Sequence, residues 1–214
     1  MSRNRIQPRC PRCLLHVPLC LCAELPRIEV ETRVVLVPHA VEWRQASNTG
    51  RIAMLTLSDV ELAVWGKRGE PLDPSRLAAP EGTRTVLLFP SDGAPSLAPR
   101  DDGRPVRLLV PDGTWRQGRR IARKLSTLPH VERARVAAPP QRTLRKRPSE
   151  DRLGTGEAIA AALEALGEVD AATALREAVR TMVDRTLFVR GTLAADHVRG
   201  GVSIAVRRAL GTPR

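Results

Sequence analysis

The amino-acid sequence predicts an α/β domain in which a mostly parallel sheet is flanked by helices. Short runs of β-branched and aliphatic residues, bounded by Pro and Gly, alternate along the chain with helical patterns, as in sheets whose strands are joined through helices. Apolar residues make up 42% of the 214 residues, which is enough for one sizeable core. We expect an N-terminal cysteine segment over residues 1–28, the α/β domain over 29–198, and a basic tail over 199–214.

Charge and aromatic content limit the kinds of partner. The formal net charge of +12 favours a polyanion, and arginine, which holds phosphates bidentately, far outnumbers lysine. A GC-rich genome also raises arginine content without any function, so the excess favours nucleic acid without proving it. The chain has no Tyr and two Phe, which nearly excludes base-stacking platforms built from these residues.

The apolar runs of the chain are all short. None reaches the length that spans a membrane, and the first residues lack the apolar segment of a signal peptide. We therefore expect a cytoplasmic protein without a membrane partner. The sequence leaves the oligomeric state open.

All four cysteines lie near the N-terminus, as Cys10-Pro-Arg-Cys13 and Cys20-Leu-Cys22. In the cytoplasm, where disulfides are rare, four thiols this close predict a tetrahedral structural zinc site. Four thiolates leave no open position for water or substrate, so this metal is not expected to be catalytic. The alternatives are free or redox thiols in a flexible tail, or a site in which His16 replaces one cysteine.

Residues 32–38 predict a first buried strand, followed by an exit loop that contains His39. The sequence Ser-Asn-Thr-Gly at 47–50 then opens a helical stretch over 51–57 and offers caps and free amides, an arrangement that suits an anion. Plain helix capping by Asn48 and Thr49 is the alternative. Further strands are predicted over 60–65 and 85–89, with loops over 66–83 and 92–105.

Residues 106–110 predict the central strand, because this apolar run is bounded by prolines on both sides. Asp112-Gly113 is a turn signal, and Thr114 can cap the helix that follows. Asp112 and Trp115 therefore stand at the carboxyl end of a strand, where open α/β sheets bind their ligands. The alternative is a structural aspartate beside a packed tryptophan.

A basic helix is predicted over 117–125, with Ile121 and Leu125 on its buried face and arginines toward solvent. Several positive charges on one helix, without Glu residues to pair with them, suggest phosphate contacts. A fifth strand is predicted over 133–136, a strongly basic loop over 141–148, and two helices over 157–166 and 171–189.

Several separated motifs together resemble one family, the DTW-domain proteins, which are tRNA-uridine aminocarboxypropyltransferases. The resemblance runs from about Cys10 to Arg190, and its strength lies in the order and spacing of the set. One departure is Gly154, where the family usually has Ser. The motifs are the two cysteine pairs, Ser47-Asn-Thr-Gly-Arg51, Leu88-Phe-Pro-Ser91, Asp112-Gly-Thr-Trp115, Leu144-Arg-Lys146 and Leu153-Gly-Thr-Gly-Glu-Ala158.

This resemblance implies a fold related to the knotted SPOUT methyltransferases. It implies that S-adenosylmethionine is the cosubstrate and that its 3-amino-3-carboxypropyl group, not its methyl group, moves to N3 of a uridine in tRNA. Methylthioadenosine is then released, and tRNA rather than DNA is the expected partner. The particular tRNA and uridine stay open.

The resemblance also assigns roles to residues. Asp112 is the expected general base or N3-orienting acceptor, and Trp115 the expected wall beside the sulfonium. Cosubstrate contacts are expected from Phe89, Pro90, Ser91, Gly113, Thr114, Arg145, Leu153, Thr155 and Glu157. Contacts to the uridine or the tRNA are expected from Asn48, Thr49, Arg51, Arg116, Arg119 and Arg120.

Two other functions fit part of the sequence. An RNA methyltransferase of the SPOUT-like class would use the same cosubstrate but release S-adenosylhomocysteine. A zinc-bearing RNA-binding module without catalysis would explain the charge and the cysteines, but not the motifs at the strand ends.

Overall fold

The computed structural model describes residues 8–91, 93–100, 103–137, 142–144 and 153–210. Its centre is a five-stranded sheet with the order β2-β1-β4-β3-β5, and every pairing in it is parallel. The mostly parallel α/β sheet predicted from the sequence is therefore confirmed. The strands are β1 (Arg33–Pro38), β2 (Val60–Leu62), β3 (Arg84–Leu88), β4 (Val106–Asp112) and β5 (Val131–Ala134).

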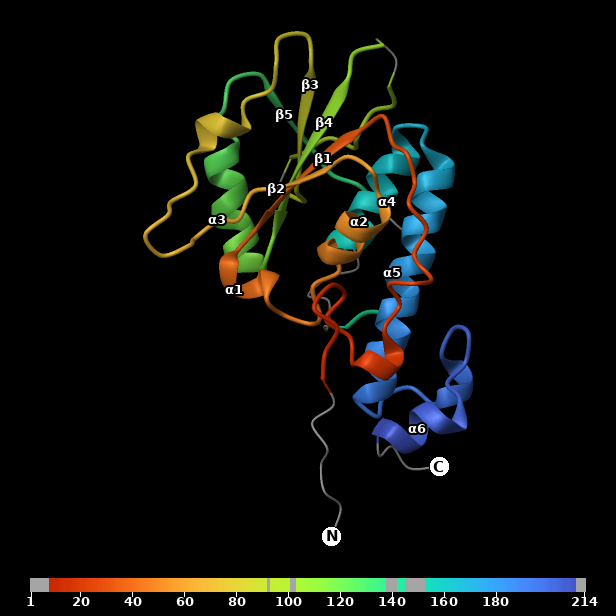
Figure 1. Cartoon of the computed structure of the whole chain (residues 1–214). Coiled ribbons are helices and arrows are strands. Elements are labelled where there is room, and N and C mark those ends of the chain that lie inside the picture. Colours follow the sequence, from red (N-terminus) through yellow and green to blue (C-terminus); the bar gives the residue numbers. More distant parts are fainter. Residues whose placement is uncertain (1–7, 92, 101–102, 138–141, 145–152, 211–214) are drawn as a thin grey trace.

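Helices cover both faces of the sheet, with α3 on one face and α2, α4 and α5 on the other (Figure 1). Successive side chains of a strand point to opposite faces. In β4, Leu108 and Val110 belong to the larger core on the side of α4 and α5, whereas Leu109 packs with Ile121 and Leu125 of α3. The helices are α1 (Ala40–Trp43), α2 (Gly50–Thr56), α3 (Trp115–Leu125), α4 (Thr155–Ala165), α5 (Val169–Val189) and α6 (Ile204–Leu210).

The predicted elements occur with shifted ends. The central strand β4 continues through Pro111 to Asp112, so that the carboxylate is the last residue of the strand itself. Helix α3 begins at Trp115, because Thr114 caps it by accepting from the backbone of Gln117 at 3.4 Å. Strand β2 ends at Leu62, earlier than predicted, and Trp65 joins the neighbouring strand exit through an isolated parallel bridge to His39.

The two ends of the described chain lie together (Figure 1). Leu19, in the 3-10 helix η1 (Val17–Leu19), forms a small apolar cluster with Phe188, Val198 and Val202, and α6 packs against it. Helix α6 lies within the segment that the sequence marks only as a basic tail. Short 3-10 helices also occur at η2 (Pro74–Leu77) and η3 (Ala195–His197).

Two further expectations concern the path of the chain and membranes. A knotted, SPOUT-like path is not shown by these strand pairings and stays a prediction. No helix in the described part of the chain is long and apolar enough to cross a membrane.

Candidate functional site

A cavity of about 360 Å³, here called the main cavity because most of the predicted site residues line it, opens where β3 and β4 end and α2, α3 and α4 begin. Its size lies in the range of about 300–1,000 Å³ that small-molecule sites occupy. Eleven of the predicted site residues line it, although the sequence places them in four separate motifs. They are Asn48, Thr49, Phe89, Pro90, Asp112, Gly113, Thr114, Trp115, Leu153, Thr155 and Glu157.

Asp112 forms part of the cavity wall, is 7% exposed, and both of its carboxylate oxygens accept hydrogen bonds. Nδ2 of Asn48 donates to Oδ2 at 2.5 Å, and the hydroxyl of Thr155 donates to Oδ1 at 2.5 Å. These donors come from the starts of α2 and α4, 64 residues before and 43 residues after Asp112 in the chain. The two bonds fix the plane of the carboxylate at the cavity wall.

The position of Asp112 follows from the alternation of β4. Asp112 has the same parity as Leu108 and Val110, so its side chain points to the face covered by α2 and α4. Its carbonyl accepts from the backbone N–H of His39 at 2.8 Å, which joins the ends of β4 and β1. Helix N-termini carry partial positive charge, and α2, α3 and α4 all begin around this carboxylate.

Two aromatic side chains line the cavity on the α3 side. The rings of Phe89 and Trp115 are tilted by 55° with centroids 6.1 Å apart. Gly118 makes room for this pair, because a Cβ at that position would stand 3.0 Å from the ring of Phe89. The predicted wall role of Trp115 is compatible with this placement and stays a prediction.

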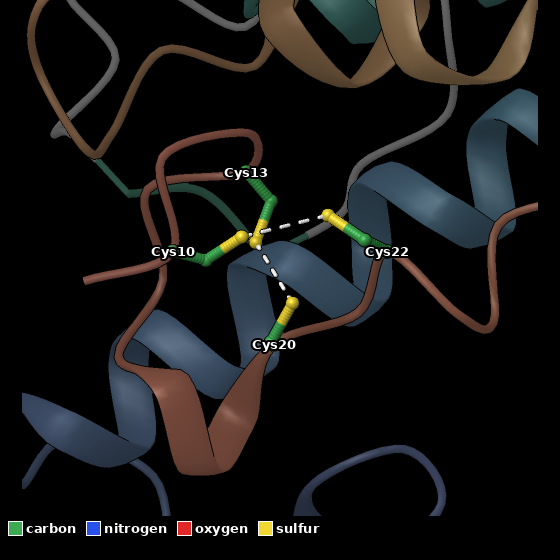
Figure 2. A group of neighbouring side chains, drawn as sticks. All are labelled: Cys10, Cys13, Cys20 and Cys22. Carbon is green, nitrogen blue, oxygen red and sulfur yellow. Dashed lines mark hydrogen bonds between the residues drawn. The ribbon is translucent and has the colours of Figure 1, made fainter. Parts of the chain in front are cut away.

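The four cysteine sulfurs form one cluster (Figure 2), and they all lie within 4.8 Å of one another. Sγ of Cys10 is 3.7 Å from Sγ of Cys22, and Sγ of Cys13 is 3.7 Å from Sγ of Cys20. Four sulfurs bound about 2.3 Å from one tetrahedral ion are about 3.8 Å apart, so the donor set fits a metal of this kind. A backbone hydrogen bond from Cys13 lowers the pKa of the Cys10 thiol to about 6, whereas burial raises the pKa of Cys20 and Cys22.

Two arginines attach the cysteine segment to the rest of the domain. Arg185 of α5 is buried and donates to the carbonyls of Leu19 and Cys20 at 3.2 and 3.3 Å. Arg51 of α2 donates to the carbonyl of Arg12 at 3.5 Å. The segment thus packs against α2, which begins at the cavity, and against α5, whose Val183 lines the cavity.

The family model described as the DTW domain matches residues 7–187. The chain belongs to the DTW domain family. The resemblance drawn from the sequence motifs is therefore confirmed.

A curated relative of this DTW domain chain is tRNA-uridine aminocarboxypropyltransferase 2 of Macaca fascicularis. The two are 26% identical over 169 residues, which cover 75% of this chain and 57% of the relative. The chain therefore spans little more than half the length of that protein. No solved structure matches the chain.

Five predicted site residues of the DTW domain lie away from the lining of the main cavity. Ser91 follows the lining residues Phe89 and Pro90, and Arg116, Arg119 and Arg120 line neighbouring hollows on α3. The guanidinium of Arg51 stacks on Trp43 at 4.1 Å and donates to its carbonyl at 2.5 Å, and burial lowers its pKa. Substrate contact by these residues stays a prediction. Arg145 lies outside the described residues.

Sequence reasoning missed several residues of the cavity wall. No site role was expected of Glu42, or of Ser47 at the start of the 47–51 motif, although the exit of a parallel strand is where ligand contacts gather. Thr143 and Leu144 also line the cavity, and the carbonyl of Leu144 accepts from Nη1 of Arg190 at 2.7 Å. This hydrogen bond comes from the residue that follows α5, and no signal in the local sequence predicts it.

Close packing of α2 and α4 brings Asn48 and Thr155 together at Asp112. At Gly156, a Cβ would stand 2.8 Å from the carbonyl oxygen of Thr49 and 2.7 Å from Cγ2 of Val179. The Gly156 N–H donates to Oγ1 of Thr49 at 3.0 Å. A side chain at 156 would therefore push the two helices apart.

We expect Gly156→Ala to lower the free energy of unfolding by about 1–3 kcal/mol, because neither the backbone of Thr49 nor the buried valine can yield without a shift. The matched variant is Gly154→Ser, which restores the residue usual in the family. Gly154 is the N-cap of α4 in an extended conformation, and a Cβ there meets Oγ1 of Thr49 at an ordinary 3.4 Å. Gly154→Ser should be neutral or stabilise by a few tenths of a kcal/mol. Equal losses in denaturant titrations of both variants would contradict this packing argument.

Proposed function

We propose that this DTW domain transfers the 3-amino-3-carboxypropyl group of S-adenosylmethionine to N3 of a uridine in tRNA. The observation that carries the proposal is the buried carboxylate of Asp112, held by Asn48 and Thr155 on the wall of the main cavity. The relative from Macaca fascicularis is named a tRNA-uridine aminocarboxypropyltransferase, which supports the same reaction. Cytoplasmic tRNA is the proposed substrate.

The charge of the cavity supports a cationic cosubstrate. Glu42, Asp112 and Glu157 line it, and no residue of its described lining is Lys, Arg or His. Glu157 is 5% exposed and its Oε2 accepts from the backbone N–H of Gly154 at 2.9 Å, so this carboxylate is held in place. S-adenosylmethionine carries a sulfonium and an ammonium group against one carboxylate, and opposite charges attract strongly at a partly enclosed site.

The proposed chemistry needs a proton acceptor and alignment. N3 of the uridine gives up its proton and bonds to the γ-carbon, the bond from that carbon to sulfur breaks, and methylthioadenosine leaves. Asp112 takes the proton in this proposal, while Asn48 and Thr155 keep its oxygens turned to the cavity. Alignment of N3, the γ-carbon and sulfur decides between this transfer and methyl transfer.

We also propose that the four cysteines bind one structural zinc ion. The sulfur separations of 3.7 Å match a tetrahedral site, and all four ligands come from one short segment. Such an ion supplies folding free energy to a segment too short to fold unaided. Cys10, Cys13, Cys20 and Cys22 would hold it, and their arrangement leaves the main cavity to the transfer reaction.

The identity of the nucleoside product tests the proposed reaction. We expect purified chain, S-adenosylmethionine and tRNA to give methylthioadenosine and 3-(3-amino-3-carboxypropyl)uridine in equal amounts, measured by mass spectrometry of digested tRNA. S-adenosylhomocysteine with a methylated nucleoside would instead establish the methyltransferase alternative. Absence of S-adenosylmethionine binding in calorimetry would favour the non-catalytic RNA-binding module.

A further inference from the structure

A second hollow, the side hollow, lies next to the main cavity and has no role in the reaction as described so far. Its volume is about 310 Å³. It is built from the exit of β1, the exit of β2 and the first turns of α3. Its lining residues are His39, Trp65, Thr114, Arg116, Gln117 and Arg120.

We propose that the side hollow binds a nucleotide next to the target uridine, within a single-stranded stretch of the RNA substrate. The proposal rests on the proposed function in so far as it takes RNA as the substrate of the main cavity. The base would contact Trp65 and His39, and the phosphate would lie against Arg116 and Arg120. The described lining of the main cavity has aromatic side chains but no basic one, so the phosphate contacts of a bound strand are expected in the hollows beside it.

His39 and Trp65 form what is here called the floor of the side hollow, and backbone hydrogen bonds join this floor to the strand end that carries Asp112. The backbone N–H of Ala40 donates to the carbonyl of Trp65 at 2.8 Å, and the backbone N–H of Trp65 donates to the carbonyl of Pro38 at 2.8 Å. The backbone N–H of His39 in turn donates to the carbonyl of Asp112 at 2.8 Å. A ligand of the side hollow would therefore be held in a set position relative to the carboxylate of Asp112.

The groups of the floor suit a nucleobase. Trp65 is half-buried, packs in part against the core under α3, and presents the rest of its side chain to the side hollow. Nδ1 of His39 accepts from the backbone N–H of Val41 at 3.3 Å, which leaves Nε2 as the nitrogen that carries the proton in the neutral ring. Stacking on an aromatic ring needs no particular base, and an N–H donor suits the carbonyls of pyrimidines.

The wall formed by α3 suits phosphate. Arg116 and Arg120 are exposed, lie one helical turn apart, and have no acidic partner in the described part of the chain. They also line a further hollow of about 560 Å³ with Trp115, Arg119 and Arg123, here called the arginine groove. Arginine forms paired hydrogen bonds to phosphate, so the arginines along this helix can bind successive phosphates of a nucleic-acid backbone.

The three hollows share residues, which gives the order of nucleotides along them. Thr114 lines both the main cavity and the side hollow, and Trp115 lines both the main cavity and the arginine groove. A strand that crosses these two residues places one base in the main cavity while its neighbour reaches the side hollow. Recognition of the neighbouring nucleotide would then help to select the uridine that is modified.

Trp65→Leu tests the stacking contact, because leucine keeps apolar packing against the core but removes the aromatic face. With full-length chain, we expect this variant to raise the Kd for a short oligouridylate and the KM for tRNA by about 5- to 150-fold. The salt dependence of binding and the affinity for S-adenosylmethionine should not change. Trp65→Phe should recover most of the loss.

Arg116→Ala tests the phosphate contact and stays informative even where a Trp65 variant folds poorly. We expect weaker RNA binding with a slope of log affinity against log salt smaller by about one. The matched control is Arg208→Ala on α6, which removes one charge from an exposed arginine far from α3 and should keep the parent affinity (Figure 1). Equal weakening by both arginine variants would mean that net charge alone acts, and would overturn the site.

The outcomes separate this proposal from the proposed function. Normal aminocarboxypropyl transfer with parental RNA affinity in Trp65→Leu would overturn the side hollow as a nucleotide site and leave the enzyme intact. A parent chain that binds oligouridylate but shows no transfer would contradict the proposed function. If its Trp65 and Arg116 variants then bind oligouridylate more weakly, the nucleotide site would still be supported.

Discussion

Asp112→Asn is expected to lower the rate of the proposed aminocarboxypropyl transfer by about 100- to 10,000-fold, the usual contribution of a positioned general base. The variant removes the proton acceptor but keeps the shape of the side chain. An amide oxygen can still accept from Nδ2 of Asn48, and an amide N–H can donate to the hydroxyl of Thr155, which also serves as an acceptor. The fold around the main cavity should therefore survive.

Single-turnover measurements with saturating S-adenosylmethionine and tRNA read this effect most directly. The affinity for tRNA should match that of the parent, since the arginines that we expect to bind phosphate lie outside the main cavity. Asp170→Asn is the matched control, because Asp170 is exposed in the first turn of α5. Transfer at more than a tenth of the parental rate in Asp112→Asn would place the proton acceptor elsewhere.

The elements of the fold could be predicted because their signals are local. Apolar runs bounded by prolines marked β4, and a cap followed by a 3.6-residue pattern marked α3. Strand order carries no such signal, since β4 enters the sheet between β1 and β3 although β3 comes before it in the chain. The motifs meet around the main cavity only because of this strand order, which places the end of β1 beside Asp112.

The candidate site was predictable as a set of residues but not as a set of contacts. The hydrogen bonds from Asn48 and Thr155 to Asp112 span long stretches of chain and follow from helix packing at Gly156. Arg51 illustrates the converse. It stands three residues after Asn48, yet its guanidinium turns to Trp43 and Arg12, because the cysteine segment packs against α2.

The largest effect on stability is expected from loss of the proposed zinc site. Cys13 is 1% exposed and belongs to the larger core together with Cys10. Cys13→Ser should therefore cost both a metal ligand and buried packing. For a domain of this size, a loss of about 4 kcal/mol lowers the melting temperature by roughly 8–16 °C. Metal analysis of the purified parent should give one zinc ion per chain, and the variant should have lost it.

The consequences of metal loss should reach the cavity through α2 and α5. The carbonyls of Arg12, Leu19 and Cys20 are held by Arg51 and Arg185, so a loosened cysteine segment releases contacts on both helices. Chelation of the parent at moderate temperature should reproduce the lowered melting temperature, and added zinc should reverse it.

His16→Ala separates the four-cysteine site from the alternative in which His16 replaces one thiolate. Because the four clustered sulfurs can fill all four positions of a tetrahedral ion, His16→Ala should keep its zinc and most of its stability. Zinc loss in His16→Ala, with zinc retained in Cys13→Ser, would reverse the assignment. A parent chain that binds no zinc and gains no stability from it would leave the four thiols as a redox group or as buried apolar contacts.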